Sequence, residues 1–317
     1  MKAEAFLADL EAKPATLRAL AGLLSEQHWP VARHDRLLLA GMGSSWFAAD
    51  SIARRLRRAG VHAVAELASV EASYPPDPSL TVIAISASGG SKETLELLTA
   101  HHGISRTIAL TNAPTATLPA DHTLLLHAGA ELGGVACRSY THTLATLLHL
   151  EHQLTGGLPD LAKKFELASD ATAALLADRS WLPEVRATLA GPQGCWLLAP
   201  AERMANALQG ALMFREGPRQ AADGCETGDW NHVDVYLTKS LDYRALLFAG
   251  GRFDADAVQW MRERRSHFVV VGGHLPGADV EVRYPGDDDP VVALLTEVLI
   301  AELIAADLWL HPDRSDR

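Results

Sequence analysis

The chain contains 317 residues, of which 48% are hydrophobic and 21% are charged. Both fractions are close to globular averages, which excludes disorder as the main state of the chain. This length predicts roughly two domains, because most domains span about 100–200 residues. The 28 basic and 39 acidic residues give a net charge of −11, without the basic excess of nucleic-acid-binding proteins. We therefore expect no nucleic-acid partner.

The number of cysteines and the hydropathy of the chain indicate its cellular location. Three widely spaced cysteines suit a reducing compartment and argue against a disulfide framework: Cys137, Cys195 and Cys225. Acidic residues interrupt the first twenty positions, so that stretch does not resemble a signal peptide. The most apolar segment, residues 291–310, carries three acidic residues and predicts a packed helix instead of a membrane span. The sequence predicts a cytoplasmic protein with no membrane partner.

Short apolar runs alternate with helical stretches along the first half of the chain. Strands are predicted at residues 36–40, 61–66, 80–85, 107–110 and 123–126. Helices are predicted at residues 47–58, 93–101 and 137–154. The basic run Arg54, Arg55, Arg57 and Arg58 is expected on a solvated helix face. Strands separated by such helices predict right-handed βαβ units and a parallel, doubly wound sheet.

The second half repeats this order after a helical stretch at residues 160–188. Strands are predicted at 195–199, 245–248 and 268–271, and helices at 203–216, at 254–265 and from about 290. We therefore predict a tandem repeat of two flavodoxin-like, three-layer αβα domains with parallel sheets. The predicted parts are an N-terminal helical segment (1–30), a first domain (31–160), a linker helix (161–188) and a second domain (189–317).

Two turns rich in serine and glycine carry the chemistry. The turns at residues 41–45 (GMGSS) and 86–91 (SASGGS) each join a predicted strand to a predicted helix. In a parallel sheet both lie at the carboxyl edge, where hydroxyls and helix N-terminal N–H groups can bind an anion. One such turn could be purely structural, because Ser and Gly are ordinary turn residues. Two at one edge favour a phosphate cradle.

The same turns argue against a nucleotide. The dinucleotide fingerprint G-x-G-x-x-G would need glycine at position 46, which is Trp46. No G-x-x-x-x-G-K-[ST] loop is present either. The sequence therefore predicts a small phosphorylated ligand.

Longer segments resemble the sugar isomerase (SIS) domain family. LLLAGMGSSWFAA, ISASGGSKETLELL, ALTN and AGAELGGVACRSYTHTLATLLHL occur in that family's order. In the second half, ALQGALMFREGPRQAADGCETGDWNHVDV is similar to part of the second SIS domain in the isomerase half of glucosamine-6-phosphate synthase and in related isomerases and deglycases. The resemblance implies a tandem pair of SIS domains that act on a phosphorylated sugar.

The resemblance also implies roles for individual residues. The positions that hold the sugar phosphate match Ser45, Ser86, Ser88 and Ser91. The positions that line the pocket match Met42, Gly43, Ser44 and Glu131. Glu216 matches the acid–base glutamate that moves a proton between sugar carbons 1 and 2. His232 matches the histidine linked to ring opening, which reaches in from the neighbouring subunit in dimeric relatives. A homodimer with shared sites is therefore expected.

The residue types suit this chemistry, although each has a plainer interpretation. A carboxylate in a partly buried site can have a pKa raised towards neutrality, and histidine titrates near neutrality. Without the resemblance, Glu216 would be read as a surface carboxylate paired with Arg215 or Arg219. His232 would be read as a surface or capping residue.

Several departures from the family limit the expected reaction. The chain has no lysine after Lys239, whereas the synthase has a tail lysine that forms a Schiff base, so turnover without a Schiff base is expected. Ala136 stands where relatives commonly carry serine. Residues 199–201 are Ala-Pro-Ala where a second cradle would need Gly and Ser, so one phosphate site per chain is expected. No glutaminase domain is recognisable, which excludes glutamine-dependent synthesis by this chain alone.

These observations lead to one functional prediction with an alternative. The chain is predicted to isomerise, deaminate or deglycate a phosphorylated sugar or amino sugar through an enediol or enamine-like intermediate, without a cofactor. The alternative is a non-catalytic sensor of sugar phosphates. His149 and His152 stand one helical turn apart, but no third ligand is evident and no metal is expected.

Overall fold

The computed structural model describes residues 1–71 and 73–312, which divide into two compact units. The N-unit comprises Thr16–Ala130 and Ala136–Phe165. The C-unit comprises Met1–Ala15, Glu131–Val135 and the described residues from Glu166 onward. The units are interleaved in sequence, because the first helix belongs to the C-unit.

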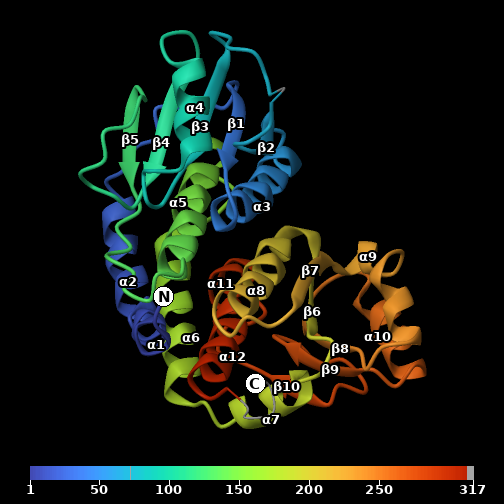
Figure 1. Cartoon of the computed structure of the whole chain (residues 1–317). Helices are drawn as coiled ribbons and strands as arrows, with labels where there is room; N and C mark the ends of the chain where they lie inside the picture. Colours follow the sequence, from blue (N-terminus) through green and yellow to red (C-terminus); the bar gives the residue numbers. More distant parts are fainter. Residues whose placement is uncertain (72, 313–317) are drawn as a thin grey trace. The chain divides into compact units, whose positions relative to one another are not determined.

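The N-unit is built on a five-stranded parallel sheet (Figure 1). Its strands are β1 (Arg36–Gly41), β2 (Ala63–Leu67), β3 (Leu80–Ile85), β4 (Arg106–Thr111) and β5 (His122–Leu125), in the order β2-β1-β3-β4-β5. Every neighbouring pair is parallel. The five predicted strands are confirmed, with bounds that differ by at most two residues. The central strand β3 is buried along its whole length, as expected for a sheet covered on both faces.

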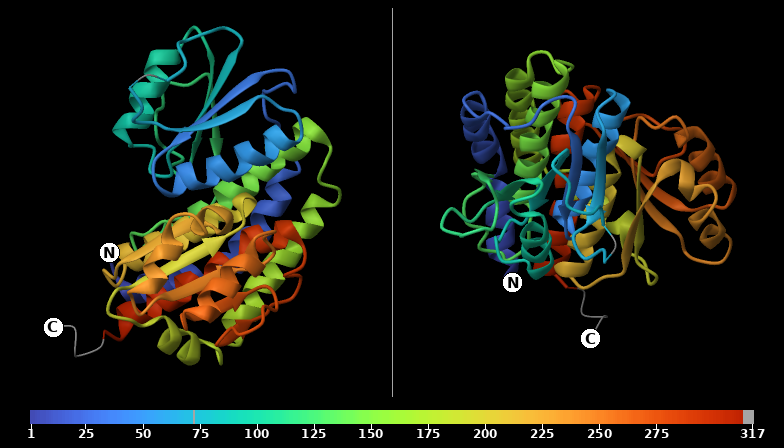
Figure 2. Two further views of the ribbon diagram at one scale, coloured as in Figure 1. Left: turned by 90° about the vertical axis from the view of Figure 1, so that its right-hand side faces the viewer. Right: turned by 90° about the horizontal axis from the view of Figure 1, so that it is seen from above.

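Helices connect the strands of this sheet. The N-unit contains α3 (Ser44–Arg58), α4 (Lys92–His101), α5 (Arg138–Thr155) and most of α2 (Lys13–Leu24). Helix α3 connects β1 to β2, and α4 connects β3 to β4. Because β2 and β4 lie on opposite sides of the β1–β3 pair, right-handed connections place α3 and α4 on opposite faces (Figure 2). Helix α5 packs against α3.

A buried ion pair joins α3 to α5. Arg55 donates from Nε to Glu151 Oε2 over 2.6 Å and from Nη2 to Oε1 over 3.2 Å, and both side chains are at least nine-tenths buried. The solvated position expected for Arg55 is therefore wrong. Arg54 does lie at the surface, where it pairs with Asp50.

Removal of Glu151 should cost much of the stability of the N-unit. The Glu151→Ala variant leaves the Arg55 guanidinium buried without its counter-ion, so we expect the free energy of unfolding to fall by about 3–5 kcal/mol. Asp50→Ala, which breaks the less buried neighbouring pair with Arg54, is the matched control and should change the free energy of unfolding by less than about 1 kcal/mol. Urea titration of both variants measures the difference, and equal effects would contradict the argument.

The C-unit is built on a second five-stranded parallel sheet. Its strands are β6 (Cys195–Ala199), β7 (Ala222–Glu226), β8 (Arg244–Phe248), β9 (His267–Val271) and β10 (Val280–Val282), in the order β10-β9-β8-β6-β7. The three predicted strands are confirmed, whereas β7 and β10 were not predicted. Both are edge strands, one half-exposed with the sequence ADGCE and the other three residues long. Counted from the first strand of each unit, both sheets have the order 2-1-3-4-5.

The C-unit contains the remaining helices, except that the first residues of α6 belong to the N-unit. They are α1 (Ala3–Glu11), α6 (Leu161–Ala177), α7 (Leu182–Leu189), α8 (Met204–Glu216), α9 (Thr227–Trp230), α10 (Asp254–Glu263), α11 (Pro290–Thr296) and α12 (Val298–Leu310), with 3₁₀ turns η1 (Ala201–Arg203) and η2 (Asp234–Lys239). The predicted helix at 160–188 is two helices, because Pro183 starts a new helix in the first turn of α7.

The apolar C-terminal segment packs inside the C-unit. Helix α12 contacts α1, α7 and α8, and its buried Glu302 forms an ion pair with buried Lys13. Within residues 1–71 and 73–312, no helix combines the length and the apolar character needed to span a membrane.

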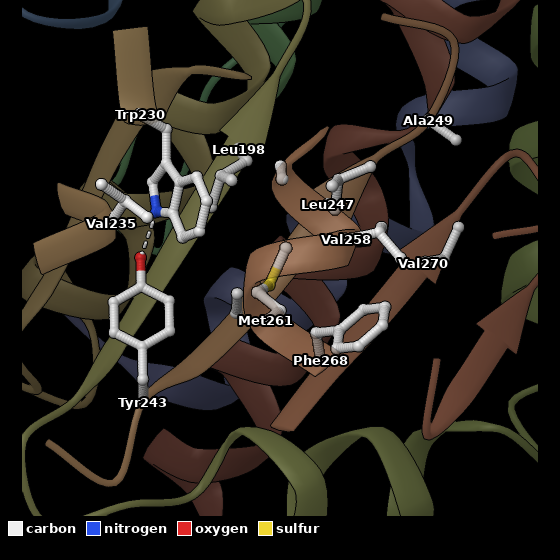
Figure 3. Close-up of a cluster of buried hydrophobic side chains, with 12 residues drawn as sticks. Leu198, Trp230, Val235, Tyr243, Leu247, Ala249, Val258, Met261, Phe268 and Val270 are labelled. Atoms are coloured by element: carbon white, nitrogen blue, oxygen red, sulfur yellow. Dashed lines mark hydrogen bonds between the residues drawn. The ribbon is translucent and has the colours of Figure 1, made fainter. Parts of the chain in front are cut away.

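A buried cluster covers one face of the C-unit sheet (Figure 3). Leu247 of β8 packs with Val258 and Met261 of α10 in this cluster. Trp230, the last residue of α9, donates from Nε1 to the hydroxyl of Tyr243 over 2.6 Å. This bond anchors the end of α9 two residues before His232.

Candidate functional site

The two serine- and glycine-rich turns start side by side. Strands β1 and β3 are neighbours, and their last residues, Gly41 and Ile85, are partners in the register. A Cβ atom at Gly41 would lie 2.7 Å from Cβ of Ser45 and 3.1 Å from the carbonyl oxygen of Ile85. Only glycine at position 41 therefore allows this close approach. The predicted meeting of the two turns at one sheet edge is observed.

The first turn leads directly into α3. Gly43 has φ +50°, and the helix begins at Ser44. The N–H of Ser45 donates to the carbonyl oxygen of Met42 over 3.1 Å. Met42, Gly43, Ser44 and Ser45 are all half-buried. The turn thus presents two hydroxyls at the positive end of a fifteen-residue helix.

The second turn is ordered by its own serines. Ser86 is buried, and its Oγ accepts the N–H of Ser91 over 3.4 Å. Ser88 is exposed, and its Oγ accepts the N–H of Gly90 over 3.2 Å. Gly89 has φ +67° and donates its N–H to Ser86 O. The turn therefore holds three hydroxyls at different depths before α4 begins.

A residue that the sequence left without a role braces this turn. Asn112 follows β4, and its N–H donates to the carbonyl oxygen of Ala87 over 3.0 Å. Its side chain accepts the N–H of Ala128 over 2.9 Å and donates to Gly129 O over 2.7 Å. Asn112 therefore links the second turn to the loop after β5. Its position at the carboxyl end of a strand, in the ALTN segment, is the signal that identifies it.

An acidic side chain lies at the entrance to α4. Ser91 donates its hydroxyl to Glu93 Oε2 over 2.9 Å. The backbone N–H of Glu93 and this hydroxyl together lower the pKa of Glu93. The first turn of α4 therefore already stabilises a negative charge, as expected for a helix N-terminus.

Glu216 is the last residue of α8 and lies half-buried in the C-unit. Burial raises its pKa, and the charges of Arg219 and Arg215 oppose that change. Throughout the described residues, no ion pair within 4.0 Å joins Glu216 to either arginine. The pKa of Glu216 is therefore shifted in the direction that a general base near neutral pH requires, and in the described residues the carboxylate does not form the surface ion pair of the plainer interpretation.

His232 is exposed and follows α9. Its N–H donates to the carbonyl oxygen of Asp229 over 2.8 Å. It lines a cavity of about 650 Å³ together with Glu226, Gly228, Asp229, Asn231, Phe253, Asp256, Gln259 and Trp260. His232 is therefore an exposed residue in the lining of an acidic and aromatic cavity.

Glu131 is half-buried in the short segment Glu131–Val135 of the C-unit. Burial raises the pKa of Glu302 on α12, and the negative charge of Glu131 adds to that effect. The predicted site residues are thus distributed over both units. The turn residues 42–45 and 86–91 lie in the N-unit, whereas Glu131, Glu216 and His232 lie in the C-unit.

The carboxylate nearest in sequence to the histidines of α5 is already engaged. Glu151, which stands between His149 and His152, is paired with Arg55. Among the residues that the structure describes, no group of three or more His, Cys, Asp or Glu side chains has the arrangement of a metal site.

Fold and turns together define an α/β protein with two serine- and glycine-rich turns side by side at the carboxyl edge of its first sheet. Residues 31–151 match the model of the SIS domain family. This part of the chain is a SIS domain, as the sequence resemblance indicated.

Curated relatives extend the likeness beyond this domain. The chain is 29% identical over 310 residues to the glutamine–fructose-6-phosphate aminotransferase (isomerizing) of Thermococcus kodakarensis, an alignment that covers 90% of this chain and 51% of that protein. The chain therefore spans about half the length of this relative.

Solved structures show the same fold over nearly the whole chain. The C-terminal domain of glucosamine-fructose-6-phosphate aminotransferase from Francisella tularensis has a TM-score of 0.80 at 16% identity, covering 96% of this chain and 95% of that one. Glucosamine-6-phosphate deaminase from Thermotoga maritima has a TM-score of 0.75 at 16% identity, covering 96% and 94%.

Proposed function

We propose that the chain binds a phosphorylated sugar or amino sugar at the two turns of the N-unit, here called the cradle (residues 42–45 and 86–91). The observation that carries this proposal is the register pair Gly41–Ile85, which starts both turns side by side. Hydroxyls and helix N-terminal N–H groups at one edge suit the oxygens of a phosphate. The names of the relatives, which act on fructose 6-phosphate and glucosamine 6-phosphate, support the same ligand class.

The proposed reaction transfers a proton between carbons 1 and 2 of the opened sugar. Glu216 takes the proton from one carbon, which leaves an enediol or, from an amino sugar, an enamine-like intermediate. Glu216 then returns the proton to the neighbouring carbon. The raised pKa of Glu216 supports this role, because a general base works best when its pKa approaches the working pH. Isomerisation, deamination and deglycation share this step.

His232 is proposed to assist ring opening, which needs one group that can both donate and accept a proton. Its exposure supports an action on the cradle of a second subunit, with Met42, Gly43, Ser44 and Glu131 shaping the pocket. The functional unit would then be a homodimer with two shared sites.

We also propose that the two halves descend from one duplicated unit. The shared strand order 2-1-3-4-5 supports this origin. A reducing, cytoplasmic location is proposed from the three cysteines, none of which forms a disulfide within the described residues. Burial raises the pKa of the Cys195 thiol to about 12.

A substrate panel tests the proposed activity. The chain would be incubated with hexose 6-phosphates, amino-sugar phosphates and fructosamine phosphates. Aldose–ketose exchange, ammonia and free amino acid are then measured. Turnover of a phosphorylated member, with no turnover of its unphosphorylated counterpart, is the expected result. Tight binding of one member without turnover of any would instead identify a sugar-phosphate sensor.

Subunit mixing tests the shared site. Glu216→Gln and His232→Ala chains are each expected to be inactive. After subunit exchange, each heterodimer holds one site with both residues intact, so about a quarter of the wild-type site number should recover under random mixing. Native mass spectrometry verifies the exchange. No recovery of activity in proven heterodimers would mean that both residues serve the site of one chain.

A further inference from the structure

The C-unit repeats the strand geometry that forms the cradle. Strands β6 and β8 are neighbours and pair in parallel, for example at Leu198 and Leu247. They are the first and third strands of their sheet, as β1 and β3 are in the N-unit. The turns that follow them, residues 200–203 and 249–253, therefore occupy the positions equivalent to the cradle turns.

A carboxylate of the chain itself directly follows the second of these turns. Asp254 is the first residue of the ten-residue helix α10 and is only 4% exposed. Its Oδ2 accepts the N–H groups of Gly250 and Gly251, each over 2.8 Å. Gly250 has φ +111°, a conformation that favours glycine. Two converging backbone N–H groups thus hold one carboxylate oxygen at a helix N-terminus.

A buried cation comes from the first of these turns. Arg203 ends η1, is 9% exposed and donates to the carbonyl oxygen of Ala249. Its Nε also donates to Glu297 over 3.0 Å. A Cβ atom at Gly250 would lie 3.5 Å from both terminal nitrogens of Arg203. The guanidinium therefore lies against the same glycine turn that holds Asp254.

The hydrogen-bonding capacity of the Asp254 carboxylate is only partly satisfied. Asp254 Oδ1 is buried and has no hydrogen-bond partner. Burial raises the pKa of Asp254, even though the two glycine N–H groups and Arg203 lower it. Oδ1 is thus an acceptor to which the turn supplies no donor, and the turn satisfies only one of the two carboxylate oxygens.

We propose that this turn is a second oxyanion cradle whose anion is the Asp254 carboxylate. The chain fills the site itself, so no phosphate binds there in the native protein. Gly250, Gly251 and Arg203 form a latent site for a tetrahedral oxyanion such as inorganic phosphate or sulfate, which opens when the carboxylate is removed. The equivalence to the N-unit cradle rests on the proposed function, whereas the Asp254 geometry does not.

Removal of the carboxylate tests the proposal in the full-length chain. Asp254→Ser shortens the side chain and keeps a residue suited to a helix start; Asp254→Gly is the second variant. Inorganic phosphate is titrated at constant ionic strength to about 50 mM, a concentration high enough to detect a dissociation constant in the millimolar range. The amide resonances of Gly250 and Gly251 are followed by NMR. Both resonances should shift and saturate in the variants and stay unchanged in the native chain.

Stability gives an independent readout. Phosphate should raise the unfolding midpoint of the Asp254 variants by about 2–4 °C more than that of the native chain, because it binds only the folded state. Asp289→Ala is the matched control: it removes a helix-capping carboxylate at α11, and phosphate should give it no extra gain. Should the variants fold only in phosphate, and not in chloride at the same ionic strength, the proposal is also supported.

The design separates this site from the N-unit cradle. The same measurements are made in chains that also carry Ser88→Ala and Ser91→Ala, which remove phosphate binding at the N-unit cradle under the proposed function. The shifts of Gly250 and Gly251 should persist in that background. Folded Asp254 variants whose two glycine resonances ignore phosphate would overturn the latent site, as would variants that fail to fold with or without phosphate. Neither result would touch the proposed function.

Discussion

The Glu216→Gln variant is expected to lower kcat by ~10²–10⁴-fold, the usual contribution of a general base. Glutamine keeps the size of the side chain but cannot take up a proton at neutral pH. Because the loss concerns the transition state, kcat and kcat/KM should fall by similar factors while KM changes little. Initial rates on the panel member that turns over fastest provide the measurement. Glu184→Gln, an exposed carboxylate of the same unit, is the control and should be silent.

The raised pKa of Glu216 also predicts how the activity should change with pH. Burial raises the pKa of Glu216 above its ordinary 4.5, so the base form appears only as the pH rises through that higher value. The acidic limb of kcat/KM in the native chain should therefore lie above pH 4.5. Glu216→Gln should remove this limb from its residual activity. A variant with an unchanged limb would assign the limb to another group.

Stability should change in the opposite direction to activity. A carboxyl group whose pKa is higher in the folded state favours folding most below its unfolded pKa and loses that contribution as the pH rises through the folded value. At neutral pH the charged Glu216 side chain thus lowers the stability of the folded state. The Glu216→Gln variant should therefore unfold at the same or a higher urea concentration than the native chain. A clear loss of stability would indicate that the residue is structural.

The sequence predicts the sheet cores better than the sheet edges. LTVIAI at 80–85 and FVVV at 268–271 are central apolar runs, and burial alone dictates them. The edge strand β7 carries Asp223 and Gly224, which are typical turn residues and do not indicate a strand. The segment is a strand because it pairs with β6, a contact that the local sequence does not reveal. The break between α6 and α7, by contrast, has a local signal, because Pro183 lies in the first turn of α7.

Contacts between residues far apart in the sequence account for the features that the sequence did not predict. Arg55 is indistinguishable from its basic neighbours along the helix, since its partner Glu151 is 96 residues away. The cradle turns were predicted because each carries its own serine and glycine pattern. Ala-Pro-Ala at 199–201 lacks that pattern, and nothing in the sequence indicated that the pairing of β6 with β8 brings Asp254 and Arg203 to the same turn.

The Ser88→Ala/Ser91→Ala variant is expected to weaken binding of the phosphorylated ligand by roughly 10²–10⁴-fold. Each hydroxyl is proposed to donate to a phosphate oxygen, and the loss of one charge-assisted hydrogen bond costs about 1.5–3 kcal/mol. Folding should be nearly unaffected, because Ser88 is exposed and Ser91 is only half-buried. Calorimetric titration measures the dissociation constant. Ser79→Ala, an exposed hydroxyl before β3, is the control and should bind like the native chain.

Glu93 supplies a variant with the opposite sign. Its carboxylate accepts the Ser91 hydroxyl, so a phosphate at Ser91 must displace it while the two negative charges repel each other. Glu93→Gln should therefore tighten binding of the same ligand, and raised ionic strength should narrow its difference from the native chain. Unchanged affinity in the double-serine variant, together with no gain in Glu93→Gln, would place the phosphate away from α4. Weakening in the first and tightening in the second would locate it at the first turn of that helix.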